Sequence, residues 1–128
     1  MAESLVLLDT SILIDYFRKK DKTKSRLYEL TDYYDGFVIS VITEFEIYVG
    51  AKDDQLPFWT RLLAEIPVIP LDSSIAEIAV NLNNQLKTSK NQIAIADLFI
   101  ASTALSLGVP CASLNRKHFS RLKDLSVI

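Results

Sequence analysis

The stretch Leu5-Val6-Leu7-Leu8-Asp9-Thr10-Ser11-Ile12-Leu13-Ile14 decides how the chain begins its fold. Its first four apolar residues predict a short buried strand that ends at Asp9. Thr10 or Ser11 can cap the helix that follows, which we expect to run through residues 16 and 17. A buried strand that leads directly into a helix is typical of parallel α/β sheets, so we expect an α/β fold.

The rest of the chain repeats this alternation of short strands and helices. Further strands are predicted at residues 37–40, 68–71 and 110–113, with an additional edge at 126–128. Helices are predicted at residues 24–33, 42–49, 56–65 and 96–107, and a long helix is capped by one of residues 72–74. No linker, repeat or low-complexity segment interrupts the pattern, so residues 1–128 are expected to form a single domain.

Composition narrows the class of protein. Hydrophobic residues make up 49% of the chain and charged residues 23%, as in an ordinary globular domain. No apolar stretch approaches the roughly 20 residues that cross a bilayer, and the N-terminus has no basic region like that of a signal peptide. Cys111 is the only cysteine, which excludes an intrachain disulfide and a thiolate metal cluster. We expect a cytoplasmic protein with a buried free thiol.

Three carboxylates occupy positions where burial is expected: Asp9, Glu46 and Asp97. Asp9 ends the first strand. We place Glu46 on the apolar face of its helix, together with Ile42, Phe45 and Val49. Asp97 shares a similar face with Ile93, Ile100, Ala101 and Ala104. A buried carboxylate is costly unless it becomes neutral, pairs with a cation or binds a metal. Three inward acids from three elements therefore favour one shared divalent cation.

Each acid also has a simpler interpretation. Asp9 could cap the helix that follows it, and Asp97 could stabilise the positive end of its helix dipole. Glu44 competes with Glu46, because residues two positions apart on a helix differ by about 200° in direction, so only one of them can face inward. We favour Glu46. Asp15 lies one turn after Ser11 and is expected on the outer face of its helix.

Basic residues gather in two segments, although the formal net charge is −2. The first group contains Arg18, Lys19, Lys20, Lys22, Lys24 and Arg26, and the second contains Arg116, Lys117, Arg121 and Lys123. Both groups are either solvated surface or a basic rim around an acidic centre. The acidic total argues against strong non-specific binding of nucleic acid. His118 is the only histidine, which excludes a histidine metal cluster, and it is expected to be a packed or surface residue.

Four segments carry a resemblance to a known family. They are Leu7-Leu8-Asp9-Thr10-Ser11-Ile12-Leu13-Ile14-Asp15, Ile39-Ser40-Val41-Ile42-Thr43 continuing through Glu46 to Gly50, Ala96-Asp97-Leu98-Phe99-Ile100-Ala101, and Leu114-Asn115-Arg116-Lys117-His118-Phe119. In this order they resemble PIN domains, specifically the VapC-type toxin ribonucleases of type II toxin–antitoxin systems. The resemblance implies a three-layer sandwich with a central, mostly parallel sheet flanked by helices.

The resemblance also implies a site and an activity. The metal-binding acids of the family fall on Asp9, Glu46 and Asp97, which would bind Mg²⁺ or Mn²⁺ in an endoribonuclease. The fourth polar position falls on Asn115, where many PIN domains have Asp, and this lowers the charge available for a second metal. Thr10 and Ser113 could orient water or ligand, and Ser113 replaces the usual Thr. Arg116, Lys117 or the cluster from Arg18 to Lys24 could contact RNA phosphates. The family further implies a homodimer and a VapB-type antitoxin that covers the site.

Other functions remain open at the level of sequence. One alternative is a PIN nuclease that matures RNA or acts on DNA. Another is a non-catalytic PIN module that binds RNA or protein through the same cleft, which the Asn at position 115 allows. A receiver-like phosphoacceptor domain fits poorly, because it would need paired acids before Asp9 and a lysine late in the chain.

Overall fold

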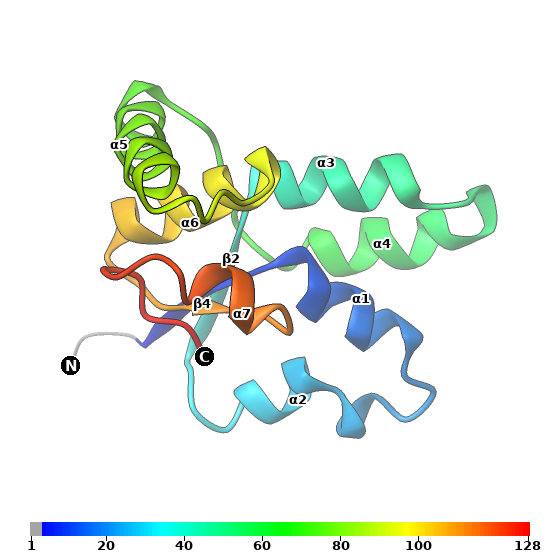
Figure 1. Ribbon diagram of the computed structural model, residues 1–128. Helices are drawn as coiled ribbons and strands as arrows, with labels where there is room; N and C mark the ends of the chain where they lie inside the picture. Colours follow the sequence, from blue (N-terminus) through cyan, green and yellow to red (C-terminus); the bar gives the residue numbers. More distant parts are fainter. Residues whose placement is uncertain (1–3) are drawn as a thin grey trace.

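The computed structural model describes residues 4–128 and contains a parallel four-stranded sheet (Figure 1). Strand β1 (Leu5–Leu8) lies inside the sheet, between β2 (Gly36–Ser40) and β4 (Cys111–Ala112). Strand β3 (Val68–Ile69) pairs with the outer edge of β2, which gives the order β3-β2-β1-β4. All three pairings are parallel, with Leu7 opposite Val38 and Cys111. The predicted α/β class with a parallel sheet is confirmed.

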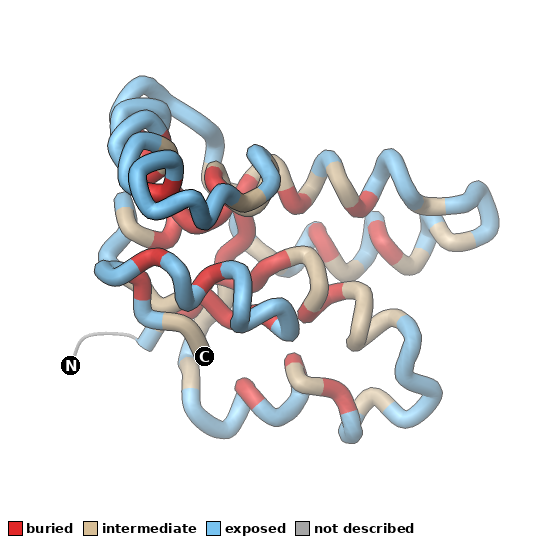
Figure 2. Tube along the Cα trace, viewed as in Figure 1, coloured by how far each residue is buried: buried red, intermediate tan, exposed pale blue. Residues whose placement is uncertain are grey.

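Successive side chains of β1 enter two different cores. Leu7 belongs to the cluster on one face of the sheet, and Val6 and Leu8 belong to the cluster on the other. Side chains of a strand alternate between its faces, so a strand covered on both faces needs apolar residues at every position. This explains the uninterrupted apolar run of β1, and the buried segments in Figure 2 run through the centre of the molecule.

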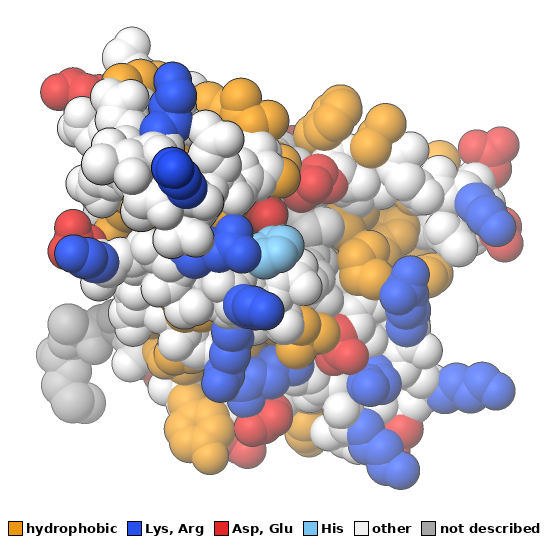
Figure 3. Space-filling view, in the orientation of Figure 1, with side chains coloured by type: hydrophobic (Ala, Val, Ile, Leu, Met, Phe, Trp, Pro, Cys, Tyr) orange, Lys and Arg blue, Asp and Glu red, His pale blue; other side chains and the backbone are white. Residues whose placement is uncertain are grey.

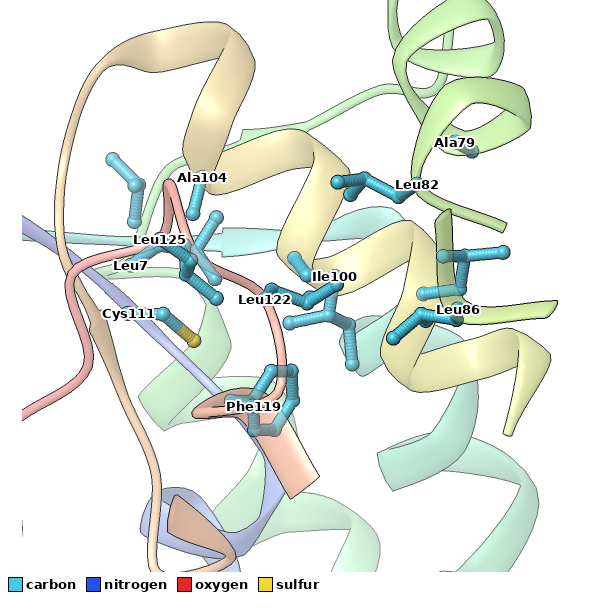
Figure 4. Close-up of a cluster of buried hydrophobic side chains, with 13 residues drawn as sticks. Leu7, Ala79, Leu82, Leu86, Ile100, Ala104, Cys111, Phe119, Leu122 and Leu125 are labelled. Carbon is cyan, nitrogen blue, oxygen red and sulfur yellow. The ribbon is translucent and has the colours of Figure 1, made fainter. Parts of the chain in front are cut away.

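Two long helices cover the Leu7 face of the sheet: α5 (Ser73–Ser89) and α6 (Ile95–Leu107). The C-terminal segment closes this core, and it includes the short helix α7 (Arg116–Phe119). Figure 4 shows side chains of α5, α6 and the C-terminal segment meeting beside the sheet: Leu82, Leu86, Ile100, Ala104, Phe119, Leu122 and Leu125, with Leu7 and Cys111. The predicted apolar stripe of α5 is buried, apart from a partly buried Ile78.

The opposite face is covered by helices from the first half of the chain, which gives the predicted three layers. These are α1 (Thr10–Arg18), α2 (Arg26–Leu30) and α4 (Leu56–Leu63), with short 3₁₀ turns at Lys22–Lys24 and Asp53–Gln55. Trp59 of α4 is buried and stacks on Phe17 of α1, with ring centroids 5.0 Å apart. Helix α3 (Val41–Gly50) continues from the end of β2 and projects alongside α4 (Figure 1).

Three elements differ from the sequence predictions. The helix predicted at 24–33 is broken at Ser25, whose hydroxyl caps α2 by accepting from the Tyr28 N–H at 3.2 Å. Strand β3 has only two residues, because prolines stand on both sides and cannot donate to the ladder. Helix α7 was predicted as a turn. The predicted edge at 126–128 is present as a bridge between Val127 and Cys111.

Two glycines lie where a side chain would meet a constraint. A β-carbon on Gly36 would lie 2.6 Å from Cδ2 of Leu5, so the end of the Leu5 side chain would have to move to admit it. Gly108 ends α6 with a φ of 67°, as the sequence predicts for a helix terminus. Within residues 4–128, no helix combines the length and the apolar character that crossing a membrane requires.

Candidate active site

An open pocket of about 420 Å³ lies at the carboxyl ends of β1 and β4. We call it the acidic pocket. Its wall is formed by Asp9, Thr10, Ser11, Ile14, Asp15, Arg18, Glu46, Asp97, Leu114 and Asn115. All four predicted polar residues of the site, Asp9, Glu46, Asp97 and Asn115, therefore share one pocket. This is the edge where parallel α/β sheets place their sites, because loops diverge beyond the strand ends.

Asp9 is the most deeply buried member, with 2% of its surface exposed. It is the N-terminal boundary residue of α1, but its side chain caps no helical N–H. Its Oδ2 instead accepts hydrogen bonds from the hydroxyls of Ser11 and Ser113. The Ser11 oxygen accepts from the Leu114 N–H at 3.0 Å, and the Ser113 oxygen accepts from the Asn115 N–H at 2.8 Å. The two serines thus tie the loop after β4 to one carboxylate oxygen.

Glu46 reaches the acidic pocket by a different helix face from the one predicted. Phe45 and Val49 are exposed to 64% and 69%, whereas Thr43 and Ile47 are the buried residues of α3. The inward placement of Phe45 and Val49 was wrong, because α3 has apolar residues on its outer surface too, whereas Ile42 is partly buried against the core as predicted. Glu46 nevertheless borders the inward face and lines the acidic pocket, while Glu44 lies on the outer surface.

Two threonines hold the Glu46 carboxylate. The Thr10 oxygen lies 2.7 Å from Glu46 Oε1 and 3.0 Å from the Thr43 oxygen. A hydroxyl carries one proton, so Thr10 donates to the carboxylate and accepts from Thr43. Thr43 is completely buried. Thr10 and Ser113 were predicted to orient water or ligand, and the structure places both hydroxyls on carboxylates of the site instead.

Asp97 lies in the first turn of α6, half-buried in the wall of the acidic pocket. Burial raises the pKa of its carboxyl group, and the negative charges of Asp9 and Glu46 raise the pKa further. His118 opposes this shift, because its Nδ1 lies 3.7 Å from Asp97 Oδ2, where an imidazole N–H and a positive charge on the ring favour the ionised carboxylate. Figure 3 shows the single histidine next to an acidic side chain at the surface. The upward shift therefore comes first from burial and then from the two neighbouring negative charges.

Two further charged residues line the acidic pocket, and one lies beside it, although none of them was among the predicted catalytic and metal-binding residues. Asp15 was expected on the outer face of α1, but it lines the acidic pocket, accepts from the Arg26 N–H at 2.9 Å and pairs with Lys19 at 3.4 Å. Its spacing of one helical turn from Ser11 was the available signal, and Arg18 lies about two turns from Ser11. His118 lies on four-residue α7, which is too short to show a periodic pattern.

Two of the predicted phosphate contacts, Arg116 and Lys117, lie outside the pocket wall. Arg116 lines a separate hollow beside Arg26 and Glu29, and Lys117 is exposed on α7. Arg18 is the cation that lines the acidic pocket. Cys111 is fully buried in the core, as predicted, and burial raises the pKa of its thiol, which keeps it unreactive.

The donor set suits a hard divalent cation, because carboxylate and amide oxygens are the ligands that Mg²⁺ and Mn²⁺ prefer. Among residues 4–128, Asp9 and Glu46 form no ion pair with Lys, Arg or His. As the side chains stand, however, no three Asp, Glu, His or Cys residues of this part of the chain are close enough to hold one ion. Direct ligation by all three acids would therefore require side-chain rotation, or water between some acids and the ion.

A parallel α/β sheet with mutually repelling acids at its carboxyl edge defines a class of domains suited to acid-ligated divalent cations. Within this class, residues 6–125 match the PIN domain, and the chain belongs to the PIN domain family. The predicted family is confirmed.

Known relatives resemble the chain over nearly its whole length. It is 36% identical over 126 residues to Ribonuclease VapC1 of Methanocaldococcus jannaschii, with 98% of this chain and 86% of the relative covered. The structure of VapBC-1 from nontypeable Haemophilus influenzae gives a TM-score of 0.82 at 25% identity, covering 97% of this chain and 96% of that chain. A toxin–antitoxin complex from Klebsiella pneumoniae gives 0.76 at 30% identity, covering 96% and 95%. These likenesses confirm the predicted relationship to VapC-type toxins.

Proposed function

We propose that the protein is a metal-dependent endoribonuclease and the toxin of a VapBC-type pair. The observation that carries this proposal is the meeting of Asp9, Glu46 and Asp97 in one pocket at the carboxyl edge of the sheet. The acids come from three separate elements, and the pKa of Asp97 is raised by burial and then by the charges of the other two. The VapC ribonucleases among the relatives support the same activity. We propose that residues 1–128 act as one PIN domain and that the protein works in the cytoplasm.

Each residue has a proposed role. Asp9, Glu46 and Asp97 hold Mg²⁺ or Mn²⁺, and Asn115 adds a neutral oxygen at the rim of the acidic pocket. Ser11 and Ser113 fix the orientation of Asp9, and Thr10 with Thr43 fixes that of Glu46. A bound divalent cation would supply an activated water and would neutralise charge on the scissile phosphate. Arg18 offers a positive charge to a phosphate that enters the pocket.

The test is cleavage of a mixed pool of structured RNA in Mn²⁺ or Mg²⁺. We expect wild type to cut the pool and EDTA to stop it, and we expect Asp97→Asn to be inactive. The products should carry 3′-hydroxyl and 5′-phosphate ends, because hydrolysis by a water does not use the 2′-hydroxyl. Equal cutting by wild type and Asp97→Asn would remove the site assignment. A 2′,3′-cyclic phosphate would contradict the proposed mechanism.

A partner antitoxin fits a second hollow that adjoins the acidic pocket. This hollow of about 240 Å³ lies between α1, α3 and α4, and it shares Ile14, Arg18 and Glu46 with the acidic pocket. Phe17, Ile47 and Trp59 give it apolar walls. We propose that an apolar segment of a VapB-type antitoxin lies here and extends a basic side chain toward the acids. A short upstream reading frame with a DNA-binding N-terminal half would support this partner, and its absence would weigh against it.

A homodimer is also proposed, and the outer face of α3 is the surface that favours it. Phe45, Tyr48 and Val49 are exposed on this face and form an apolar hollow with Val41 and Glu44. Burial of such a face against a second copy would remove apolar surface from water. Light scattering on wild type and Phe45→Lys tests the interface. A wild type that is monomeric at micromolar concentration would contradict the proposed dimer.

A further inference from the structure

The basic surfaces of the molecule differ in how many of their charges are free. The α1–α2 group contains Arg18, Lys19, Lys20, Lys22, Lys24 and Arg26. In this group, Lys19 pairs with Asp15, and Arg26 pairs with Glu29 at 2.7 Å. Lys22 donates to the backbone carbonyls of Tyr16 and Phe17 and lies over aromatic rings. Half of the six cations in this segment are therefore engaged within the fold. A charge already paired with a carboxylate contributes less to binding a phosphate.

A second basic surface lies where the end of α5 meets α7 and the segment that follows it. It combines Lys117, Arg121 and Lys123 of the C-terminal group with Lys87 and Lys90 at the end of α5, and we call it the basic strip. All five side chains are exposed, and none forms an ion pair in the described part of the chain. Arg121 and Lys123 line a hollow of about 570 Å³ with the end of α5, and Asp124 is the one acid of that hollow. Arg121 also donates to the Gln92 carbonyl at 3.2 Å, and this hydrogen bond joins the segment after α7 to the loop between α5 and α6.

The basic strip adjoins the acidic pocket. Helix α7 carries both Lys117 of the strip and His118, and His118 contacts Asp97 in the pocket wall. Figure 3 shows basic side chains directly beside the histidine, over the end of α5 and over α7. The basic side chains of the α1–α2 half extend toward the lower right of the same view. A polyanion in the pocket therefore meets Arg18 in the wall on the α1 side and can reach exposed cations on the α5–α7 side.

We propose that the basic strip binds the phosphate backbone of single-stranded RNA on one side of the cleavage site. This inference rests on the proposed nuclease function and assigns the path of its substrate. Exposed lysines around a polar hollow, without an aromatic platform, bind the backbone rather than read bases. The RNA then crosses the acidic pocket between the strip and Arg18. Apart from Arg18, the α1–α2 group contributes little to binding.

The test measures the affinity of wild type in EDTA for a 5′-fluorescein-labelled, mixed-sequence, 12-nucleotide single-stranded RNA by anisotropy. The strip variant carries Lys87→Gln, Lys117→Gln and Lys123→Gln, and it keeps Arg121 because of its contact with Gln92. The control variant carries Lys20→Gln, Lys24→Gln and Arg61→Gln, three exposed positions with the same change in net charge. A Lys→Arg version of the strip variant keeps the charges.

We expect the strip variant to bind about tenfold or more weakly near 0.1 M salt, because each lost phosphate contact removes counterion release. The slope of log affinity against log salt should become shallower by about 2, and the Lys→Arg version should bind like wild type. The control variant should lose less than about threefold. Circular dichroism should show the same fold for all variants, because every changed side chain is exposed.

Equal losses in the strip and control variants would overturn the proposal, because a general field would then explain the affinity. Unchanged RNA binding by the strip variant would also overturn it and would leave the strip as a surface for an acidic protein. If wild type cuts RNA in Mn²⁺ but does not bind the labelled RNA at 50 mM salt in EDTA, the strip assignment fails alone. If wild type neither binds nor cuts, the proposed nuclease function fails with it.

Discussion

Hydroxyl groups, rather than basic side chains, hold two of the acids of the acidic pocket. Ser11 and Ser113 donate to one oxygen of Asp9, and Thr10 donates to Glu46. This arrangement orients each carboxylate without cancelling its charge. The negative charge remains available to a cation, and outer groups of this kind set the geometry of metal ligands in proteins.

Thr43 provides a test of this role, because it is completely buried and reaches the site only through Thr10. Thr43→Val removes the hydroxyl but keeps the shape of the side chain. We expect RNA cleavage to fall about tenfold and the Mn²⁺ concentration for half-maximal rate to rise, since outer-shell changes have effects of this size. Thr43→Ser should restore both values. Wild-type metal dependence in Thr43→Val would show that Thr43 only fills space.

Asp97 gives a dependence of stability on pH. Its raised pKa means that the folded state binds this proton more tightly than the unfolded state does, so stability falls as pH rises through the raised pKa. Asp97→Asn removes the repulsion from Asp9 and Glu46. In EDTA at pH 7, we expect the variant to melt a few degrees above wild type, with a difference that shrinks toward pH 4. Thermal unfolding followed by circular dichroism measures this, and a variant less stable at pH 7 would contradict it.

At the scale of elements, the C-terminus of α1 is closed by a side chain from outside the helix. Lys22 donates to the carbonyls of Tyr16 and Phe17 at 2.7 Å and 2.9 Å, and its ammonium lies 5.3 Å from the centre of the Phe58 ring. A cation is favourable at this helix end, because the last carbonyls carry partial negative charge. The contact also joins α1 to α4.

We therefore expect Lys22→Met to lower the free energy of unfolding by about 1–2 kcal/mol, from the loss of charged hydrogen bonds and the cation–π contact. Lys20→Met is the matched control, because Lys20 is exposed and forms no ion pair among residues 4–128. Urea denaturation compares the two. Equal midpoints for both variants would show that Lys22 does not stabilise the helix end.

Sequence patterns predicted the elements that have a strong period or a clear boundary. Strand β1, the capped start of α5 at Asp72 and the end of α6 at Gly108 were all predicted correctly. The buried face of α3 was not, because apolar residues occur on both of its sides. The acids could be predicted, since a charge in an apolar segment is unusual. The resemblance singled out Thr10 and Ser113 but not the carboxylates that they contact, and nothing in the sequence marked Thr43, which looks like an ordinary core residue.

At the scale of the whole molecule, charge is separated although the net charge is only −2. Acids converge in the acidic pocket, while free cations lie on the basic strip beside it. A divalent cation would relieve the repulsion in the pocket and bind only the folded state. Its stabilisation would be about 2.7 kcal/mol at a concentration 100 times its Kd.

Saturating Mn²⁺ or Mg²⁺ should therefore raise the melting temperature of wild type by several degrees. Asp9→Asn should show little of this rise, because the most buried acid of the pocket is lost. Thermal unfolding in EDTA and in added metal measures both proteins at constant ionic strength. An identical rise in wild type and Asp9→Asn would place the metal elsewhere.

The hydrogen bond between Ser113 and Asp9 joins residues 104 positions apart, and β4 pairs with β1 only after residues 111–112 have been made. Contacts of such long range form late, because the intervening chain must first be ordered. During synthesis on the ribosome, the growing chain therefore lacks the clamp on Asp9 until the last part of the domain has emerged. The proposed nuclease site is therefore assembled in full only once residue 113 has been made and β4 has joined the sheet.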